Sequence, residues 1–361
     1  MTFYNRIDEL EIENSSICNA ACPQCAREFK PNNHNWFKQT FLLNEFFLDR
    51  IPENIYNSLK IISFAGVVGD PCAAPNFLDV CQIVKSKAPQ AKIKISTNGG
   101  MKNVEFWKNL GSLLKNTEHL IYFAIDGLED TNHLYRKNVN WSKVIDNASA
   151  FINAGGNAHW QFIVFKHNEH QIDEATKLAR NLGFSNFIAK QSHRFLFDDL
   201  FNLSPILSNG NKLMPTDIEI HRHKLLSEKK IKNLVTYINY LENKKIDCYA
   251  MHKNSVYIDA LGLAYPCCYI AGSVFLFEGL NIKIDDGWNN LWTKENKEKI
   301  NLYKNNLLDV INDDFFLKIK DGWDKNYKLG KLSICATSCS KSKDRLIDPD
   351  DFINYQKKPL I

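Results

Sequence analysis

Short apolar segments rich in β-branched and aromatic residues alternate, along the first half of the chain, with longer segments in which apolar residues recur every three or four positions. The short segments predict strands, and the longer ones predict amphipathic helices. The predicted strands are Leu10–Ile12, Ile61–Phe64, Ile93–Ser96, Ile121–Ile125, Trp160–Phe165 and Phe184–Ala189. The predicted helices include Phe77–Lys87, Val104–Leu114, Trp141–Ala154 and Gln171–Leu182.

This alternation, with about thirty residues per unit, indicates βαβ units and a parallel sheet. Six such units occupy about residues 8–190. Connections of this type are right-handed, so the sheet curls toward a barrel, but six strands are too few to close an eight-stranded one. We therefore expect an α/β fold in which residues 1–195 form a partial (β/α)6, TIM-like barrel with an open side.

The second half of the chain has a different pattern. Residues 196–245 contain no clear strand and predict a linker followed by a helix at about Lys230–Glu242. Ser255–Asp259 and Leu263–Tyr265 flank a Leu261-Gly262 turn and predict a hairpin. Polar helical segments follow it. We expect residues 246–361 to form a second, small α+β domain.

Composition narrows the class of protein. The 361 residues are 44% hydrophobic and 24% charged, which is ordinary for a globular protein and excludes a disordered, collagen-like or coiled-coil chain. The net charge of +4 is spread without a long basic run, so we expect no nucleic-acid partner. The N-terminus lacks a signal-peptide pattern, and no stretch of eighteen apolar residues exists. We expect a cytoplasmic protein with no membrane partner.

The ten cysteines are unevenly distributed. A reducing cytoplasm makes disulfides improbable, so their spacing becomes the question. Three lie near the N-terminus and five lie after residue 247, whereas none lies between Cys81 and Cys248. Core-filling cysteines would be scattered. Two thiol-rich ends around a thiol-free middle therefore suggest two soft-metal sites.

The N-terminal group is a Cys-x3-Cys-x2-Cys loop, made of Cys18, Cys22 and Cys25, directly after the first predicted strand. Three thiolates on one short loop can hold three irons of a [4Fe–4S] cube and leave the fourth iron open to another ligand. The alternatives are a zinc site or unrelated thiols. Structural zinc sites usually pair two Cys-x2-Cys knuckles, and no second knuckle is nearby in the sequence. We therefore favour a cluster.

This loop and the segments after the next strands resemble the radical S-adenosylmethionine (SAM) superfamily over about residues 8–195. Phe64–Pro71 stands where the family has a Gly-Gly-Glu-Pro segment. Ser96–Gly99 resembles its ribose-facing segment, and Ala124–Gly127 followed by Arg136 resembles its SIDG…R stretch. Each segment alone is more often a simple turn. Their order, each after a predicted parallel strand, is the stronger signal because active sites lie at that end of such sheets.

The resemblance implies specific roles for five residues around SAM. Gly69 and Asp70 would hold its amino group, and Asp70 stands where the family has Glu. Ser96 and Asn98 would face the ribose. Arg136 would pair with the SAM carboxylate, and the bidentate geometry of a guanidinium suits that contact.

The C-terminal cysteines resemble the twitch domain, the shortened SPASM extension of anaerobic sulfatase-maturating enzymes. By that resemblance Cys248, Cys267, Cys335 and Cys339 would hold one auxiliary [4Fe–4S] cluster, with Gly262 allowing the hairpin that brings Cys267 toward Cys248. The alternative is a structural zinc ion on the same four thiolates.

Cys268 directly follows Cys267, a predicted cluster ligand. By the resemblance it stands where sulfatase-maturating relatives carry an Asp that serves as a catalytic base. Adjacent side chains on an extended strand point to opposite faces, so Cys268 would face away from the auxiliary site. There it could act as a catalytic base or as a hydrogen-atom donor. The alternatives are a buried structural thiol or a substitute cluster ligand.

The resemblance implies an enzyme that cleaves SAM reductively to a 5′-deoxyadenosyl radical and takes a hydrogen atom from a small-molecule or peptide substrate. We expect net oxidation, with the auxiliary cluster as electron acceptor and a flavodoxin or ferredoxin as donor. A redox-neutral epimerase or a peptide cross-linking enzyme is the alternative within enzymes. If the protein is not an enzyme, the alternatives are a non-catalytic iron–sulfur electron carrier and a zinc-stabilised binding module.

Overall fold

The computed structural model describes residues 3–29, 37–116, 118–192, 194–195, 204–216, 234–280 and 286–340. Within these ranges eight strands form one sheet in the order β6-β5-β4-β3-β2-β1-β7-β8. Neighbouring strands pair in parallel from β6 to β7, and only β7 and β8 are antiparallel. The strands are β1 (Glu9–Ile12), β2 (Ile61–Phe64), β3 (Lys92–Thr97), β4 (Leu120–Ala124), β5 (Ala158–Val164), β6 (Asn186–Gln191), β7 (Ser255–Ile258) and β8 (Ala264–Tyr265).

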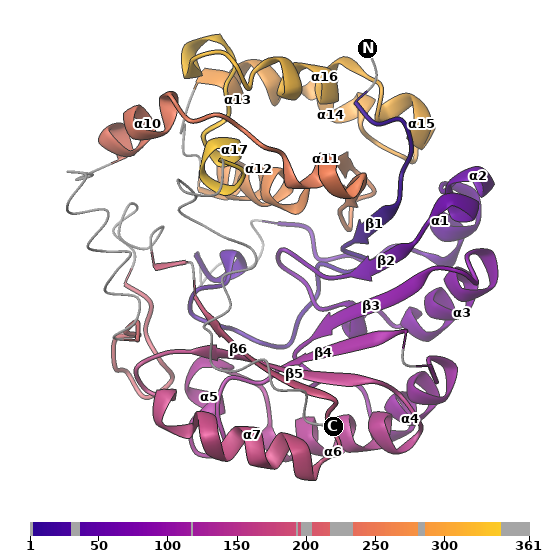
Figure 1. Ribbon diagram of the computed structural model, residues 1–361, viewed down its shortest axis with the longest axis vertical. Helices are drawn as coiled ribbons and strands as arrows, with labels where there is room; N and C mark the ends of the chain where they lie inside the picture. The colour runs from indigo at the N-terminus through magenta and orange to yellow at the C-terminus, as the bar shows by residue number, and fades with distance from the viewer. Residues whose placement is uncertain are drawn as a thin grey trace.

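The first six strands and the helices between them form the expected open barrel. Figure 1 shows α1–α7 along the outer face of the curved sheet. Their bounds are α1 (Asn44–Asp49), α2 (Glu53–Ser58), α3 (Phe77–Lys87), α4 (Val104–Leu113), α5 (Asn132–Tyr135), α6 (Trp141–Asn153) and α7 (Ile172–Asn181). Three single turns of 3₁₀ helix accompany them, at Ala26–Phe29, Pro71–Ala73 and Glu169–Gln171. The predicted βα alternation is confirmed.

The two faces of the sheet differ in polarity because side chains alternate along each strand. On β1, Leu10 and Ile12 are fully buried, whereas Glu9 and Glu11 are half-buried. The apolar residues face the helices; for example, the Phe64 and Phe77 rings lie 5.2 Å apart, edge to face. The inner face of the sheet therefore carries most of the polar residues of the strands, together with a few apolar ones such as Leu120, Ile163 and Ile188.

The C-terminal hairpin extends the barrel sheet. β7 pairs in parallel with β1, so Tyr257 lies beside Glu11, and β8 returns antiparallel to β7. Gly262 at the turn has a φ of +77°, where a side chain would also meet the Tyr303 ring. The hairpin was predicted, but its pairing with β1 was not.

Further helices precede and follow the hairpin, on the side of the sheet where β1, β7 and β8 lie (Figure 1). They are α10 (Leu234–Glu242), α11 (Tyr249–Lys253), α12 (Cys268–Leu280), α13 (Asp286–Leu291), α14 (Lys294–Lys299), α15 (Leu307–Val310), α16 (Asp314–Asp321) and α17 (Ser333–Ser338), with a 3₁₀ turn at Tyr327–Leu329. The helix predicted from Lys230 begins at Leu234 within the described residues, and most of the predicted linker lies outside them. No helix in the described ranges is long and apolar enough to cross a membrane.

The structure corrects one local prediction. Cys268 was expected on an extended strand, but it is the first residue of α12. Pro266 separates β8 from this helix, and a strand rarely continues through proline. The face of Cys268 is therefore set by the start of a helix, not by strand alternation.

Candidate functional site

The three N-terminal cysteines lie on the loop that follows β1, at the carboxyl end of the parallel strands. The Cys25 amide donates to the Cys22 carbonyl at 2.9 Å, and the Ala20 amide points at the Cys18 sulfur at 3.4 Å. Burial raises the pKa of Cys18 to about 12 and of Cys22 to about 11. Both thiols are therefore protonated at neutral pH in the metal-free chain, and metal binding must release those protons.

The loop after β2 packs directly onto this cysteine loop. A side chain at Gly69 would place its Cβ 1.7 Å from the Ser15 carbonyl oxygen, so only glycine permits the contact. The Asp70 amide donates to the Ile17 carbonyl at 2.8 Å. From the other side, the buried Arg27 guanidinium donates to the Val68 carbonyl at 3.3 Å. Predicted Gly69 therefore lies beside the predicted cluster loop.

Asp70 is only 4% exposed, and its carboxylate bonds within the protein. It accepts from the Thr97 hydroxyl at 2.9 Å, from the backbone amide of Asn98 at 2.8 Å and from the backbone amide of Cys72 at 3.0 Å. These bonds fix the turn after β3. Direct contact of Asp70 with a cofactor stays a prediction, and its described bonds favour a positioning role.

Asn98 reaches from that turn to the cysteine loop. Its side-chain Nδ2 atom donates to the Asn19 side-chain oxygen at 2.9 Å and lies 3.5 Å from the Cys18 sulfur. Ser96 lies two residues earlier, half-buried on the inner face of β3 and opposite Tyr122 of β4. The structure thus places Asn98 at the cysteine loop and Ser96 further into the barrel.

Arg136 directly follows α5, in the connection after β4, and its side chain enters the same site. Its Nε atom lies 2.6 Å from a carboxylate oxygen of Asp126, a side chain with no exposed surface, and its Nη1 lies 3.7 Å from the Cys22 sulfur. Burial raises the pKa of Asp126, and the guanidinium opposes that rise. The backbone amide of Ile163 also donates to Asp126, at 2.6 Å. Arg136 is thereby held beside the cysteine loop with its Nη1 atom directed toward Cys22.

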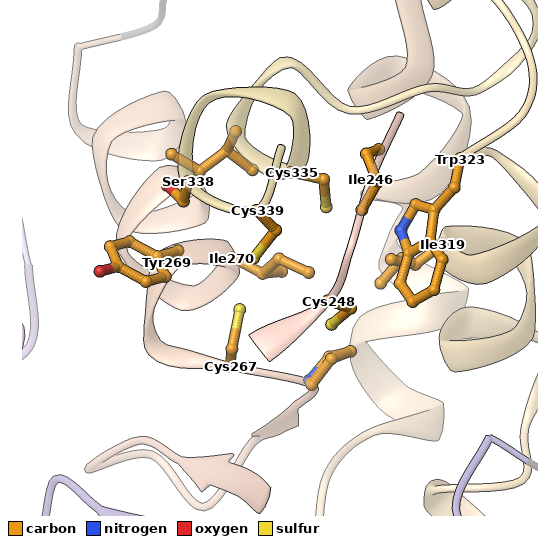
Figure 2. A pocket seen from close by; sticks show the side chains of 12 residues that line it. Ile246, Cys248, Cys267, Tyr269, Ile270, Ile319, Trp323, Cys335, Ser338 and Cys339 are labelled. Carbon is orange, nitrogen blue, oxygen red and sulfur yellow. The ribbon is translucent and has the colours of Figure 1, made fainter. Parts of the chain in front are cut away.

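The remaining predicted ligands form a second group. Figure 2 shows the sulfur atoms of Cys248, Cys267, Cys335 and Cys339 directed toward one another around a shared cavity. Its other lining residues are mainly apolar, with no carboxylate or imidazole: Ile246, Pro266, Tyr269, Ile270, Ile319, Trp323, Ile334 and Ser338. Four thiols in an apolar lining form a soft donor set, suited to zinc or an iron–sulfur cluster.

Three separate segments hold these four thiols together. Ile246 bridges to Ser340, and the Asp247 amide donates to the Cys339 carbonyl at 2.6 Å, which brings Cys248 beside Cys339. A hydrogen bond with Cys339 and burial raise the pKa of Cys248. The Cys267 sulfur accepts from backbone N–H groups in the first turn of α12. The donor chemistry of the four thiols is soft, but across the described ranges no three His, Cys, Asp or Glu side chains, these four thiols included, are arranged to hold a single metal ion.

Cys268 is outside the lining of that cavity and bonds instead with Glu11 on the inner face of β1. Burial raises the pKa of Glu11 to about 7. Sequence reasoning missed Glu11 and also Glu13, the next acidic residue. The signal was the alternation Glu9-Leu10-Glu11-Ile12-Glu13, which directs several carboxylates to one face of β1.

The sequence profile of the radical SAM superfamily matches residues 12–186. No curated protein matches the chain. Among solved structures, Streptococcus suis SuiB bound to precursor peptide SuiA has 17% identity and a TM-score of 0.56, over 95% of this chain and 75% of that one. SuiB bound to S-adenosylmethionine gives the same identity and TM-score, over 95% and 77%. The protein anSMEcpe with bound AdoMet and the Cp18Cys peptide has 14% identity and a TM-score of 0.52, over 94% and 90%. These likenesses show a shared fold.

Proposed function

We propose that this chain, whose residues 12–186 match the radical SAM profile, uses SAM to remove a hydrogen atom from its substrate and completes a net oxidation. The observation that carries the proposal is the convergence of Gly69, Asn98 and Arg136 on the loop of Cys18, Cys22 and Cys25. Those parts come from the ends of four different strands. Their meeting at one loop is what a cluster that binds SAM requires.

The described residues divide the work of binding. Cys18, Cys22 and Cys25 would hold three irons of a [4Fe–4S] cluster, because a thiolate is the usual protein ligand of such clusters. Arg136 would give the SAM carboxylate a charge-assisted partner. When bound, the cluster supplies the electron that cleaves SAM, and the resulting 5′-deoxyadenosyl radical takes the substrate hydrogen atom.

The four-thiol cavity supports an auxiliary cluster of the twitch type. Its lining of thiols and apolar side chains would keep a cluster away from water, which is one of the features that set reduction potential. A cluster held by these thiols would supply an acceptor for the electron left on the substrate after hydrogen abstraction. This arrangement favours oxidation over the redox-neutral alternative of epimerisation.

The inner face of the barrel indicates a polar substrate. Lys94, Ser96, Tyr122 and Gln161 are half-buried there, on three adjacent strands. SuiB and anSMEcpe, which share the fold, hold peptides in the structures named above. We therefore propose a polar small molecule or a peptide as substrate, with peptide cross-linking as a second candidate reaction.

The test is anaerobic incubation of the reconstituted protein with SAM and dithionite, followed by measurement of 5′-deoxyadenosine. We expect slow release by the wild type and none by Cys18→Ala/Cys22→Ala/Cys25→Ala. Cys81→Ala is the matched control, because Cys81 is buried in α3, away from both thiol groups, and should leave release unchanged. A wild type that holds iron but releases no 5′-deoxyadenosine would be an electron carrier, contrary to the proposal.

A further inference from the structure

The buried carboxylate of Glu13 has no role in the proposed chemistry, yet it accepts several hydrogen bonds. Glu13 directly follows β1 and is only 5% exposed. Its Oε1 accepts from the backbone amides of Val68 and Gly69, each at 2.8 Å. Its Oε2 accepts from the Tyr257 hydroxyl at 2.7 Å. Three donors on one carboxylate constitute a built contact between β1, the loop after β2 and β7.

This contact orients the loop that lies against the cysteine loop. The N–H and C=O groups of one trans peptide unit point in opposite directions, and the described chain has no cis peptide. Holding the Val68 and Gly69 amides toward Glu13 therefore turns the Val67 and Val68 carbonyls away from it. The Val68 carbonyl accepts from Arg27 at 3.3 Å, which fixes the same peptide from its other end. The loop is left with its acceptors, not its donors, facing away from β1.

The same carboxylate reaches the C-terminal hairpin. Tyr257 is on β7, opposite Tyr265 of β8, and Cys267 lies two residues after Tyr265. Tyr265 in turn donates to Asp259 at 3.1 Å, in the turn that joins the two strands. Glu13 therefore connects the loop beside the first thiol group to the hairpin that carries a ligand of the second.

We propose that Glu13 is a positioning residue that holds the Val68–Gly69 backbone in the form that binds SAM and ties that loop, through Tyr257, to the hairpin of the four-thiol site. The part that concerns SAM rests on the proposed function. If Glu13 is replaced by a residue without a side-chain acceptor, the buried Val68 and Gly69 amides and the Tyr257 hydroxyl lose their hydrogen-bond partner. Because a buried polar group without a partner is unfavourable, the loop should rearrange. Gln at this position keeps an oxygen for the amides, so it should preserve much of the effect.

The experiment combines hydrogen–deuterium exchange of the peptide that spans Val68 and Gly69 with SAM binding by equilibrium dialysis, both on the anaerobically reconstituted protein. We expect Glu13→Ala to speed exchange of that peptide at least tenfold and to weaken SAM binding roughly tenfold to hundredfold. Glu13→Gln should lie between wild type and Glu13→Ala in both measurements. Glu9→Ala is the matched control, because Glu9 is a carboxylate of β1 that lies four residues before Glu13, and its partners are Ser63 and Lys253 and not the loop amides.

Tyr257→Phe removes a single hydroxyl and guards against a Glu13→Ala protein that does not fold. It should speed exchange of the Val68–Gly69 peptide severalfold, with iron content unchanged. The proposal is overturned if Glu13→Ala and Tyr257→Phe both exchange this peptide and bind SAM as the wild type does. If the wild type itself does not bind SAM, the proposed function fails, and unchanged exchange in both variants still overturns the positioning role of Glu13.

Discussion

At the scale of single residues, the Arg136–Asp126 pair carries two tasks. Its atoms lie 2.6 Å apart, and the Asp126 side chain has no exposed surface. Removing one member of a buried pair leaves the other charge without compensation, which costs about 3–5 kcal/mol. Arg136 therefore contributes to the stability of the fold as well as to its proposed contact with the SAM carboxylate.

Arg136→Ala should accordingly lower the free energy of unfolding of the metal-free protein by about 3–5 kcal/mol, measured by urea denaturation under reducing conditions. Arg136→Ala/Asp126→Asn should recover part of that loss, because the neutral amide needs no counter-charge, yet its SAM affinity should stay low. An Arg136→Ala protein as stable as the wild type would contradict the buried-pair account, and a double variant with wild-type SAM affinity would contradict the contact.

Glu11 gives a prediction about pH. Burial raises its pKa from an ordinary 4.5 to about 7, so the folded chain holds the proton across a range in which the unfolded chain has lost it. Stability from this group is therefore complete below pH 4.5, falls as pH rises to 7 and is constant above, a loss of about 3 kcal/mol in all. Glu11→Gln should remove that decline and be more stable than the wild type at pH 8. Urea denaturation of both proteins from pH 5 to 8 measures how the free energy of unfolding depends on pH. Parallel pH dependences for the wild type and Glu11→Gln would contradict the raised pKa of Glu11.

At the scale of elements, the contact between the loops after β1 and β2 depends on Gly69. Gly69→Ala places a Cβ 1.7 Å from the Ser15 carbonyl oxygen, so one of the two loops must move. We expect a loss of stability above about 2 kcal/mol and of SAM binding. The control is Gly272→Ala in α12, where the nearest atom is 3.5 Å away and alanine favours a helix by about 0.5–1 kcal/mol. Equal thermal stability of the two variants would show that the loops do not pack as described.

Elements with strong periodicity were predicted from the sequence nearly to the residue. α3 is Phe77–Lys87 as expected, and β2 is Ile61–Phe64 as expected. α12 was missed because it is apolar on all sides and so lacks an amphipathic pattern; it begins at Cys268, two residues after Pro266. Because α12 starts at Cys268, the helix sets the direction of that thiol. The alternation of side chains along a strand could not predict this direction.

At the scale of the whole molecule, the candidate site was predictable where it depends on the order of strands. Cys18, Gly69, Asn98 and Arg136 each follow a predicted parallel strand, and parallel strands present their carboxyl ends at one edge. Glu13 was not predictable in the same way. Its partner Tyr257 is 244 residues away, and the pairing of β1 with β7 that joins them has no local signal.

The proposal that the chain holds two separate iron–sulfur clusters is tested most directly by iron and sulfide content after anaerobic reconstitution. The account predicts about eight irons per wild-type chain, two cubes of four. Cys18→Ala/Cys22→Ala/Cys25→Ala should keep about four, Cys248→Ala/Cys267→Ala/Cys335→Ala/Cys339→Ala should also keep about four, and the buried-thiol control Cys72→Ala/Cys81→Ala should keep about eight. Loss of all iron in either group variant, or zinc in place of iron in the wild type, would contradict it.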